Sequence, residues 1–210
     1  KLMRHFVLHL SLSVLLTLTA CSGENTVISD DALPQRQVSP AWLSAQAASQ
    51  ALAQGELSSE QLVSHYLQQI DTHNKTGHEL AAISDINSDA LAQARMLDQE
   101  RSEGKVRSAL HGLPVVLKAN ISTLDSMPTT AGALALKGHL TPADAALVSQ
   151  LRAAGAIILA KANLSEWANF RGENSASGWS ALGGQVRNPH LLSHSPCGSS
   201  SGSAVAVAAD

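Results

Sequence analysis

The sequence is short of the features that mark several common classes of protein. Its 210 residues include only two cysteines, which are too few to build a disulfide framework for a chain of this length. Aspartate and glutamate outnumber lysine and arginine by 17 to 14, so the positive charge excess of nucleic-acid-binding proteins is lacking. Aromatic residues make up 3% and charged residues 15%, but the hydrophobic fraction of 44% is ordinary for a globular protein and excludes a disordered acidic chain.

The hydrophobic run near the start of the sequence is too short to cross a bilayer. Fifteen mostly apolar residues, Phe6–Ala20, follow the basic residue Arg4, whereas a membrane-spanning helix needs about 20. A basic flank, a short apolar core and small residues before a cleavage point are typical of a secretory signal peptide. We therefore predict a removable signal over residues 1–20, with a buried helix as the alternative interpretation.

The end of this run, Leu18–Cys21, resembles the lipobox of bacterial lipoproteins. The resemblance implies that Cys21 carries lipid, becomes the first mature residue and anchors the chain to a membrane. Ser22 is not the aspartate that often retains lipoproteins at the inner membrane, so the expected location is the cell envelope, at the outer membrane and facing the periplasm. A plain signal peptide is the alternative. With Cys21 lipidated, Cys197 is the only thiol that remains for the domain.

Beyond the signal, the sequence divides into a tether and a domain. Residues 21–39 show no hydrophobic period and are interpreted as a tether, whereas residues 40–210 alternate between helical and strand patterns. Ser58 and Gln61 form a capping box that predicts the start of a helix reaching Ile70. Three further helices are predicted at residues 42–54, 89–103 and 145–154.

Two short apolar runs, Leu113–Leu117 and Ile157–Ala160, predict buried strands on either side of the helix at residues 145–154. Strand, helix and strand at this spacing predict a crossover in a mostly parallel sheet, so the fold class is α/β. A loop rich in serine and glycine, Cys197–Ser203, then leads into a helix of small residues.

Lys118 is the first candidate for chemistry, because it follows directly on a predicted buried strand. Burial of an ammonium group is costly, so it lowers the pKa of a lysine and can make the amine a base near neutral pH. The alternative is a lysine that extends into solvent at the end of its strand.

The serine-glycine loop is the second candidate. Gly198–Gly202 matches G-x-S-x-G, the nucleophile elbow of α/β-hydrolases, but the residues before it read as loop rather than strand. A phosphate-binding loop is disfavoured because no G-K-[ST] follows. His190 and His194 lie beside prolines, so no helix presents both on one face, and no metal site is predicted.

Five segments resemble, in order and spacing, the amidase signature family. These are His111–Lys118, Thr129–Gly132, Gly155–Glu166, Arg187–Pro189 and Ser195–Ala204. Trp167–Gly172 and Ser177–Ser180 are most similar to the bacterial peptide amidases of that family. The resemblance implies an α/β/α sandwich around a large mixed sheet, of which residues 40–210 would form the N-terminal part.

The resemblance also implies a reaction and its residues. Family members hydrolyse amides with a Ser–Ser–Lys triad, in which Lys118 would be the lysine and Ser199 the bridging serine, with a cis peptide bond between Gly198 and Ser199. The implied activity is hydrolysis of carboxylic amides, in particular peptide C-terminal amides, through an acyl-enzyme with release of ammonia. No metal or cofactor is implied. The implied partners are a small amide or peptide-amide substrate and, through Cys21, a membrane, but no nucleic acid and no obligate protein.

Two departures from the family pattern leave alternatives open. Ala119 stands where the family usually has aspartate, and the nucleophilic serine and oxyanion hole are expected in sequence after residue 210, so we expect residues 21–210 alone to be inactive. One alternative is an inactive envelope lipoprotein that keeps the amidase fold as a binding scaffold. The other alternative is a protein that resembles the A subunit of an amidotransferase. The substrate of that enzyme is cytoplasmic, which conflicts with a signal peptide.

Overall fold

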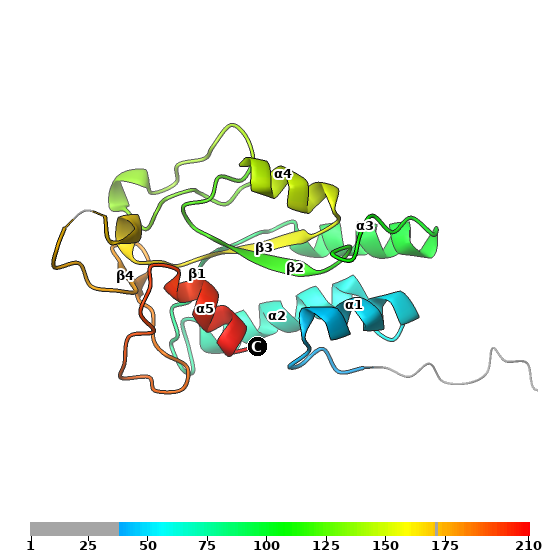
Figure 1. Cartoon of the computed structure of the whole chain (residues 1–210), viewed down its shortest axis with the longest axis horizontal. Coiled ribbons are helices and arrows are strands. Elements are labelled where there is room, and N and C mark those ends of the chain that lie inside the picture. Colours follow the sequence, from blue (N-terminus) through cyan, green and yellow to red (C-terminus); the bar gives the residue numbers. More distant parts are fainter. Residues whose placement is uncertain (1–37, 171) are drawn as a thin grey trace, which may run out of the picture. The chain divides into compact units, whose positions relative to one another are not determined.

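The computed structural model describes residues 38–170 and 172–210 (Figure 1). The predicted signal peptide, Cys21 and nearly all of the predicted tether lie outside the described residues. None of the helices formed by the described residues is long and apolar enough to cross a membrane.

Each predicted helix is present, with its ends shifted by a few residues. The capping box at the start of α2 is confirmed, since Ser58 Oγ accepts from the Gln61 amide at 3.0 Å and Gln61 Oε1 accepts from the Ser58 amide at 2.8 Å. Gly55 ends the first helix with φ of +70°, a conformation that glycine adopts at little cost. The helices are α1 (Ala45–Gln54), α2 (Ser59–His73), α3 (Ala90–Ser102), α4 (Ala146–Ala153) and α5 (Ser201–Ala208), with 3₁₀ turns η2 (Leu134–Leu136) and η3 (Glu166–Asn169).

Three strands form a mixed sheet: β1 (Ile83–Ile86), β2 (Pro114–Lys118) and β3 (Ile157–Ala162). The order is β1-β3-β2, with β2 parallel and β1 antiparallel to the central strand β3. The predicted β2–α4–β3 crossover between parallel strands is therefore confirmed. A separate two-stranded ribbon, β4 (Trp179–Ser180) and β5 (Gly184–Gln185), lies near the same end of the main sheet as the serine-glycine loop (Figure 1).

The sequence did not predict strand β1, which is short and carries two polar residues. Asn74, just after α2, fixes it from outside the sheet: its side chain accepts from the Ile83 amide and donates to the Ile83 carbonyl, both at 2.8 Å. The strand therefore depends on a side chain nine residues away and on pairing with β3, and its own sequence pattern does not specify it.

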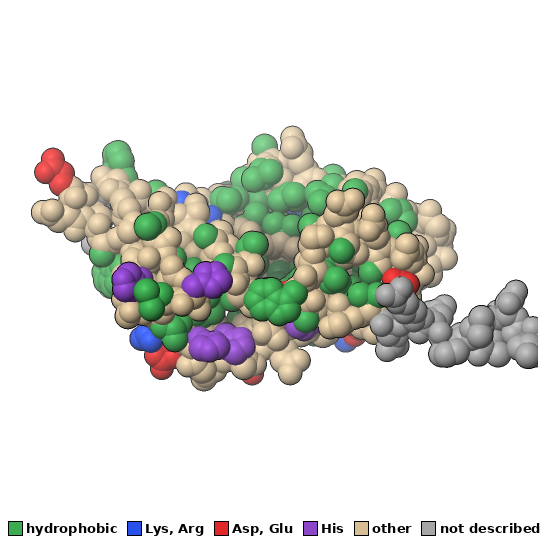
Figure 2. Space-filling model, turned by 60° about the horizontal axis from the view of Figure 1, so that its bottom comes forward, with side chains coloured by type: hydrophobic (Ala, Val, Ile, Leu, Met, Phe, Trp, Pro, Cys, Tyr) green, Lys and Arg blue, Asp and Glu red, His purple; other side chains and the backbone are tan. Residues whose placement is uncertain are grey.

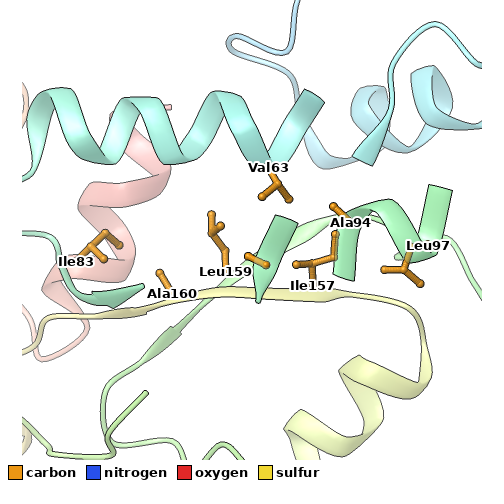
Figure 3. Close-up of a cluster of buried hydrophobic side chains, with 8 residues drawn as sticks. Val63, Ile83, Ala94, Leu97, Ile157, Leu159 and Ala160 are labelled. Carbon is orange, nitrogen blue, oxygen red and sulfur yellow. The ribbon is translucent and has the colours of Figure 1, made fainter. Parts of the chain in front are cut away.

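The two faces of the sheet bury different clusters. On one face, Val63 of α2 and Leu97 of α3 pack with Ile157 and Leu159 of β3 (Figure 3). On the other face, Val148 of α4 packs with Leu117, Met127 and Ile158. Helices α2 and α5 lie below the sheet in Figure 1 and α4 lies above it, so the described part has the layered α/β architecture that was predicted.

A shift in register in the middle of β3 changes which way its later side chains point. Val115 pairs with Ile158 but Val116 pairs with Ala160, so Leu159 has no partner of its own. Such a bulge places two successive residues toward one face, and Leu159 and Ala160 both belong to the cluster on the α2 side. Lys161 consequently lies on the α4 side, beside Leu117.

An apolar groove of about 690 Å³ runs between α1, α2, α5 and the sheet. Its lining includes Tyr66, Ile70, Leu113 and Val116, and Figure 2 shows hydrophobic side chains gathered in the hollow on this face of the molecule. Neither Lys118 nor Ser199 lines the groove, so it is distinct from the candidate site described below.

Candidate active site

The structure brings Lys118 and Ser199 together. Lys118 is the last residue of β2 and lies on the same face as Val116, two residues before it, which is the face that α5 covers. Its Nζ donates to Ser199 Oγ at 2.7 Å, although the two residues are 81 positions apart in the sequence. The Lys118 side chain is half-buried rather than extended into solvent, and this burial lowers the pKa of its amine from the usual lysine value.

The loop that carries Ser199 is fastened to the end of β3 by main-chain contacts. The Ser165 amide donates to the Ser199 carbonyl at 3.1 Å, and the Gly202 amide donates to the Asn163 carbonyl at 2.9 Å. Ser201 Oγ donates to the Cys197 carbonyl at 2.6 Å, which closes the turn from within. Ser199 is therefore held from both sides by residues of the sheet end and of its own loop.

The peptide bond between Gly198 and Ser199 is cis. Gly198 also has no room for a side chain, because a Cβ built on it would lie 2.5 Å from Ser165 Oγ and 2.6 Å from Ser201 Oγ. The residues before this loop, from Val186 to Cys197, form turns and one isolated bridge but no strand. The geometry is thus not the strand-to-helix elbow of the α/β-hydrolases.

Asn163, which follows β3 directly, joins three segments around the site. Its Nδ2 donates to the Ala81 carbonyl at 3.0 Å and to the Gly184 carbonyl at 3.2 Å, while its Oδ1 accepts from Ser180 Oγ at 2.7 Å and from the Leu164 amide at 2.8 Å. The side chain is buried with its hydrogen-bonding groups partnered. The residues next to Asn163 in the sequence do not indicate this role, because its partners Ala81, Ser180 and Gly184 are remote in the chain.

A second buried lysine, Lys161, was missed at the sequence level. It is fully buried in β3, and its Nζ donates to the Ile121 carbonyl and, at 3.2 Å, to Thr129 Oγ1. Burial lowers the pKa of its amine, and the nearby carboxylates of Asp125 and Asp85 oppose that shift. The signal in the sequence was a lysine inside an otherwise apolar strand, which is rare because a buried ammonium needs compensating partners.

His190 and His194, the weak metal candidates, are exposed in the turn before the serine loop. Among residues 38–170 and 172–210, no three metal-ligating side chains gather into a group that could hold an ion. The two groups that the structure does bring together are the Lys118 amine and the Ser199 hydroxyl.

Comparison with known proteins shows the family of the chain. The family profile described as Amidase matches residues 61–210, and the chain belongs to the amidase signature family.

The crystal structure of native peptide amidase from Stenotrophomonas maltophilia is 54% identical, with a TM-score of 0.77 over 80% of this chain and 34% of that one. A probable amidase of Arabidopsis thaliana is 48% identical over 76% of this chain and 31% of its own length. The A subunit of glutamyl-tRNA(Gln) amidotransferase from Streptomyces avermitilis is 38% identical over 75% of this chain and 30% of its own length. The chain therefore spans about a third of the length of these relatives.

Proposed function

We propose that this chain supplies the lysine and the bridging serine of an amidase that removes ammonia from peptide C-terminal amides. The hydrogen bond between Lys118 Nζ and Ser199 Oγ carries the proposal, because it joins a half-buried amine of lowered pKa to a hydroxyl that can relay a proton. The 54% identity to peptide amidase supports the substrate class. In this proposal the nucleophilic serine and the oxyanion hole come from sequence after residue 210.

The chemistry follows from the order of the three groups. Neutral Lys118 accepts the proton of Ser199 Oγ, which accepts the proton of the nucleophilic serine as that oxygen attacks the amide carbonyl. The carbon–nitrogen bond then breaks, the proton returns to the leaving nitrogen, and ammonia departs from an acyl-enzyme. Water hydrolyses the ester by the same relay run in reverse, which releases the carboxylic acid and restores the serine.

The pH dependence of the full-length protein should report this amine. Only neutral Lys118 can accept a proton, so we expect kcat/KM for a peptide amide to rise with pH through the pKa of Lys118. Because burial lowers that pKa, the increase in kcat/KM should occur at a pH lower than about 10.4, which is the pKa of an ordinary lysine. Lys118→Arg, which keeps its charge over this range, should be inactive throughout. A kcat/KM that is flat between pH 6 and 10 in the unsubstituted protein would contradict the proposal.

The amidotransferase reading is the second candidate, since A subunits of that enzyme are among the relatives. The two candidates differ in how the ammonia is used. Incubation of full-length protein with a peptide amide should release free ammonia without any partner protein or tRNA. Release that occurs only from glutamine, and only with further subunits, would favour the amidotransferase.

We further propose that Cys21 carries lipid and anchors the protein in the cell envelope, at the outer membrane. The lipobox-like Leu18–Cys21 sequence after a short apolar run supports this. In a bacterial host, Cys21→Ser should move full-length protein from the membrane fraction to the soluble fraction. Cys197→Ser is the matched control and should stay with the membrane. Membrane retention of the Cys21→Ser variant would rule out the lipid anchor.

A further inference from the structure

Lys161 lies on the opposite side of the sheet from Ser199, yet it is connected to Lys118. The first residues after β2 turn sharply, and the turn is closed by the Ile121 amide donating to the Lys118 carbonyl at 2.9 Å. The carbonyl of the same residue, Ile121, accepts from Lys161 Nζ. Ile121 is therefore held at one end by the backbone of Lys118 and at the other by the ammonium group of Lys161.

The second contact of Lys161 holds the segment in which the loop after β2 comes back to the end of that strand. Lys161 Nζ donates to Thr129 Oγ1 at 3.2 Å, and the next two residues, Thr130 and Ala131, donate their amides to the Ala119 carbonyl at 3.0 and 3.1 Å. One buried ammonium thus joins the two loop segments that leave the end of β2 and return to it. Ile121 lies three residues after Lys118, and Thr129 directly precedes the two residues whose amides donate to the Ala119 carbonyl.

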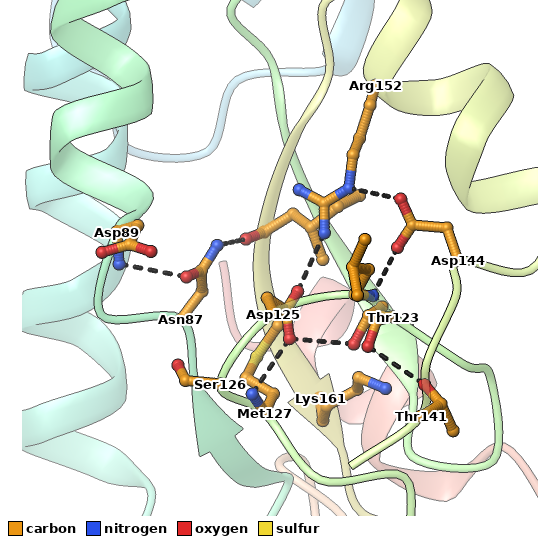
Figure 4. Close-up of polar contacts among 12 residues, drawn as sticks. Asn87, Asp89, Thr123, Asp125, Ser126, Met127, Thr141, Asp144, Arg152 and Lys161 are labelled. Carbon is orange, nitrogen blue, oxygen red and sulfur yellow. Dashed lines mark hydrogen bonds and ion pairs between the residues drawn. The ribbon is translucent and has the colours of Figure 1, made fainter.

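The charges around Lys161 are arranged so that it is near acids without a direct ion pair. Asp125, Asp85 and Asp144 favour its protonated form, and Arg152 opposes it. Two of these carboxylates are instead paired with Arg152, at 2.9 Å to Asp125 and 3.0 Å to Asp144 (Figure 4). The ammonium of Lys161 is thereby left to bond the backbone carbonyl of Ile121.

We propose that Lys161 is a positioning residue for Lys118: through Ile121 and Thr129 it fixes the turn after β2, and so directs Lys118 Nζ toward Ser199 Oγ. The proposal rests on the proposed amidase function for its catalytic consequence. Ala119 fits the same arrangement, since it is fully buried and its carbonyl accepts from the amides of Thr130 and Ala131, the residues that follow Thr129.

The test is Lys161→Met in the full-length protein, which removes the ammonium and keeps the length of the side chain. We expect kcat for a peptide amide to fall about 10²-fold with little change in KM, as is usual when a catalytic group is displaced by about 1 Å. The pKa of Lys118, measured from the pH dependence of its acetylation followed by mass spectrometry, should rise toward the ordinary lysine value as the side chain loses its buried contact. Lys161→Arg, which can still donate to the Ile121 carbonyl, should recover most of the lost kcat.

Thr141→Val is the matched control, because it removes the hydrogen bond from Thr141 Oγ1 to the Thr123 carbonyl, at 3.1 Å in the same loop, and leaves the contacts and charges around Lys161 in place. It should lower the thermal midpoint and leave the Lys118 pKa unchanged. Folded Lys161→Met with the original kcat and Lys118 pKa, or an equal change in Thr141→Val, would overturn the positioning role. If Lys161→Met does not fold, Thr129→Val decides by the same two measurements. If the unsubstituted protein releases no ammonia, the amidase proposal fails, and the acetylation measurement still decides the role of Lys161.

Discussion

Replacement of Lys118 by alanine in the full-length protein should reduce ammonia release from a peptide amide by about 10³-fold, the size of effect expected for loss of a general base. Alanine removes the amine that lies 2.7 Å from Ser199 Oγ, so the hydroxyl no longer has a base to accept its proton. Ser199→Ala should have a similar effect, because it interrupts the same relay at the next atom. The double variant should lose little more than either single variant, since the two groups act as one unit.

Lys75→Ala provides the control for this experiment. Lys75 is an exposed lysine just after α2, and its replacement should leave kcat and KM unchanged. Ammonia release is measured with a coupled assay on protein whose folding is verified by circular dichroism. Activity of Lys118→Ala within about 10-fold of the original would show that another group is the base, and the assignment of Lys118 would then be wrong.

Replacement of Gly202 by alanine should destabilise the protein by about 3 kcal/mol, the upper part of the range for inserting an atom into a packed site. Gly202 lies in the first turn of α5, where it packs against the ends of β1 and β3. A Cβ there would lie 2.2 Å from the Ala82 carbonyl oxygen and 2.4 Å from the Asn163 carbonyl oxygen. Both neighbours are backbone atoms that cannot rotate away, so α5 and its Ser199 loop must shift.

Helix propensity alone predicts the opposite sign for the change in stability. Alanine is favoured over glycine within a helix by about 1 kcal/mol, so Gly202→Ala would be expected to stabilise α5 if it were isolated. Gly172→Ala is the matched control, because among the described residues a Cβ at Gly172 would meet only Ser175 Oγ, at 3.8 Å. It should shift the thermal midpoint of the full-length protein little, whereas Gly202→Ala should lower it by several degrees. Equal midpoints for the two variants would show that the sheet end can move aside.

The elements that the sequence predicted well are those whose signals are local. The capping box of α2 needs only Ser58 and Gln61, and the helices need only a repeat of apolar residues at successive turns. Strands β2 and β3 were visible because each contains a short apolar run rich in β-branched residues, Val115–Leu117 and Ile157–Ala160. The ordered motifs also indicated the amidase family and placed Lys118 and Ser199 in one site before any geometry was known.

The sequence by itself thus determined the α/β class, the succession of main elements and the pair Lys118 and Ser199. Only the tertiary structure decided the roles of Asn163, Lys161 and Gly202. Their partners lie far away in the chain, and the bulge at Leu159 reverses the face that simple alternation would assign to Lys161. Helix and strand signals arise from hydrogen bonds and side-chain periods within a few residues, whereas burial, carbonyl partners and close backbone approaches exist only after remote segments have packed together.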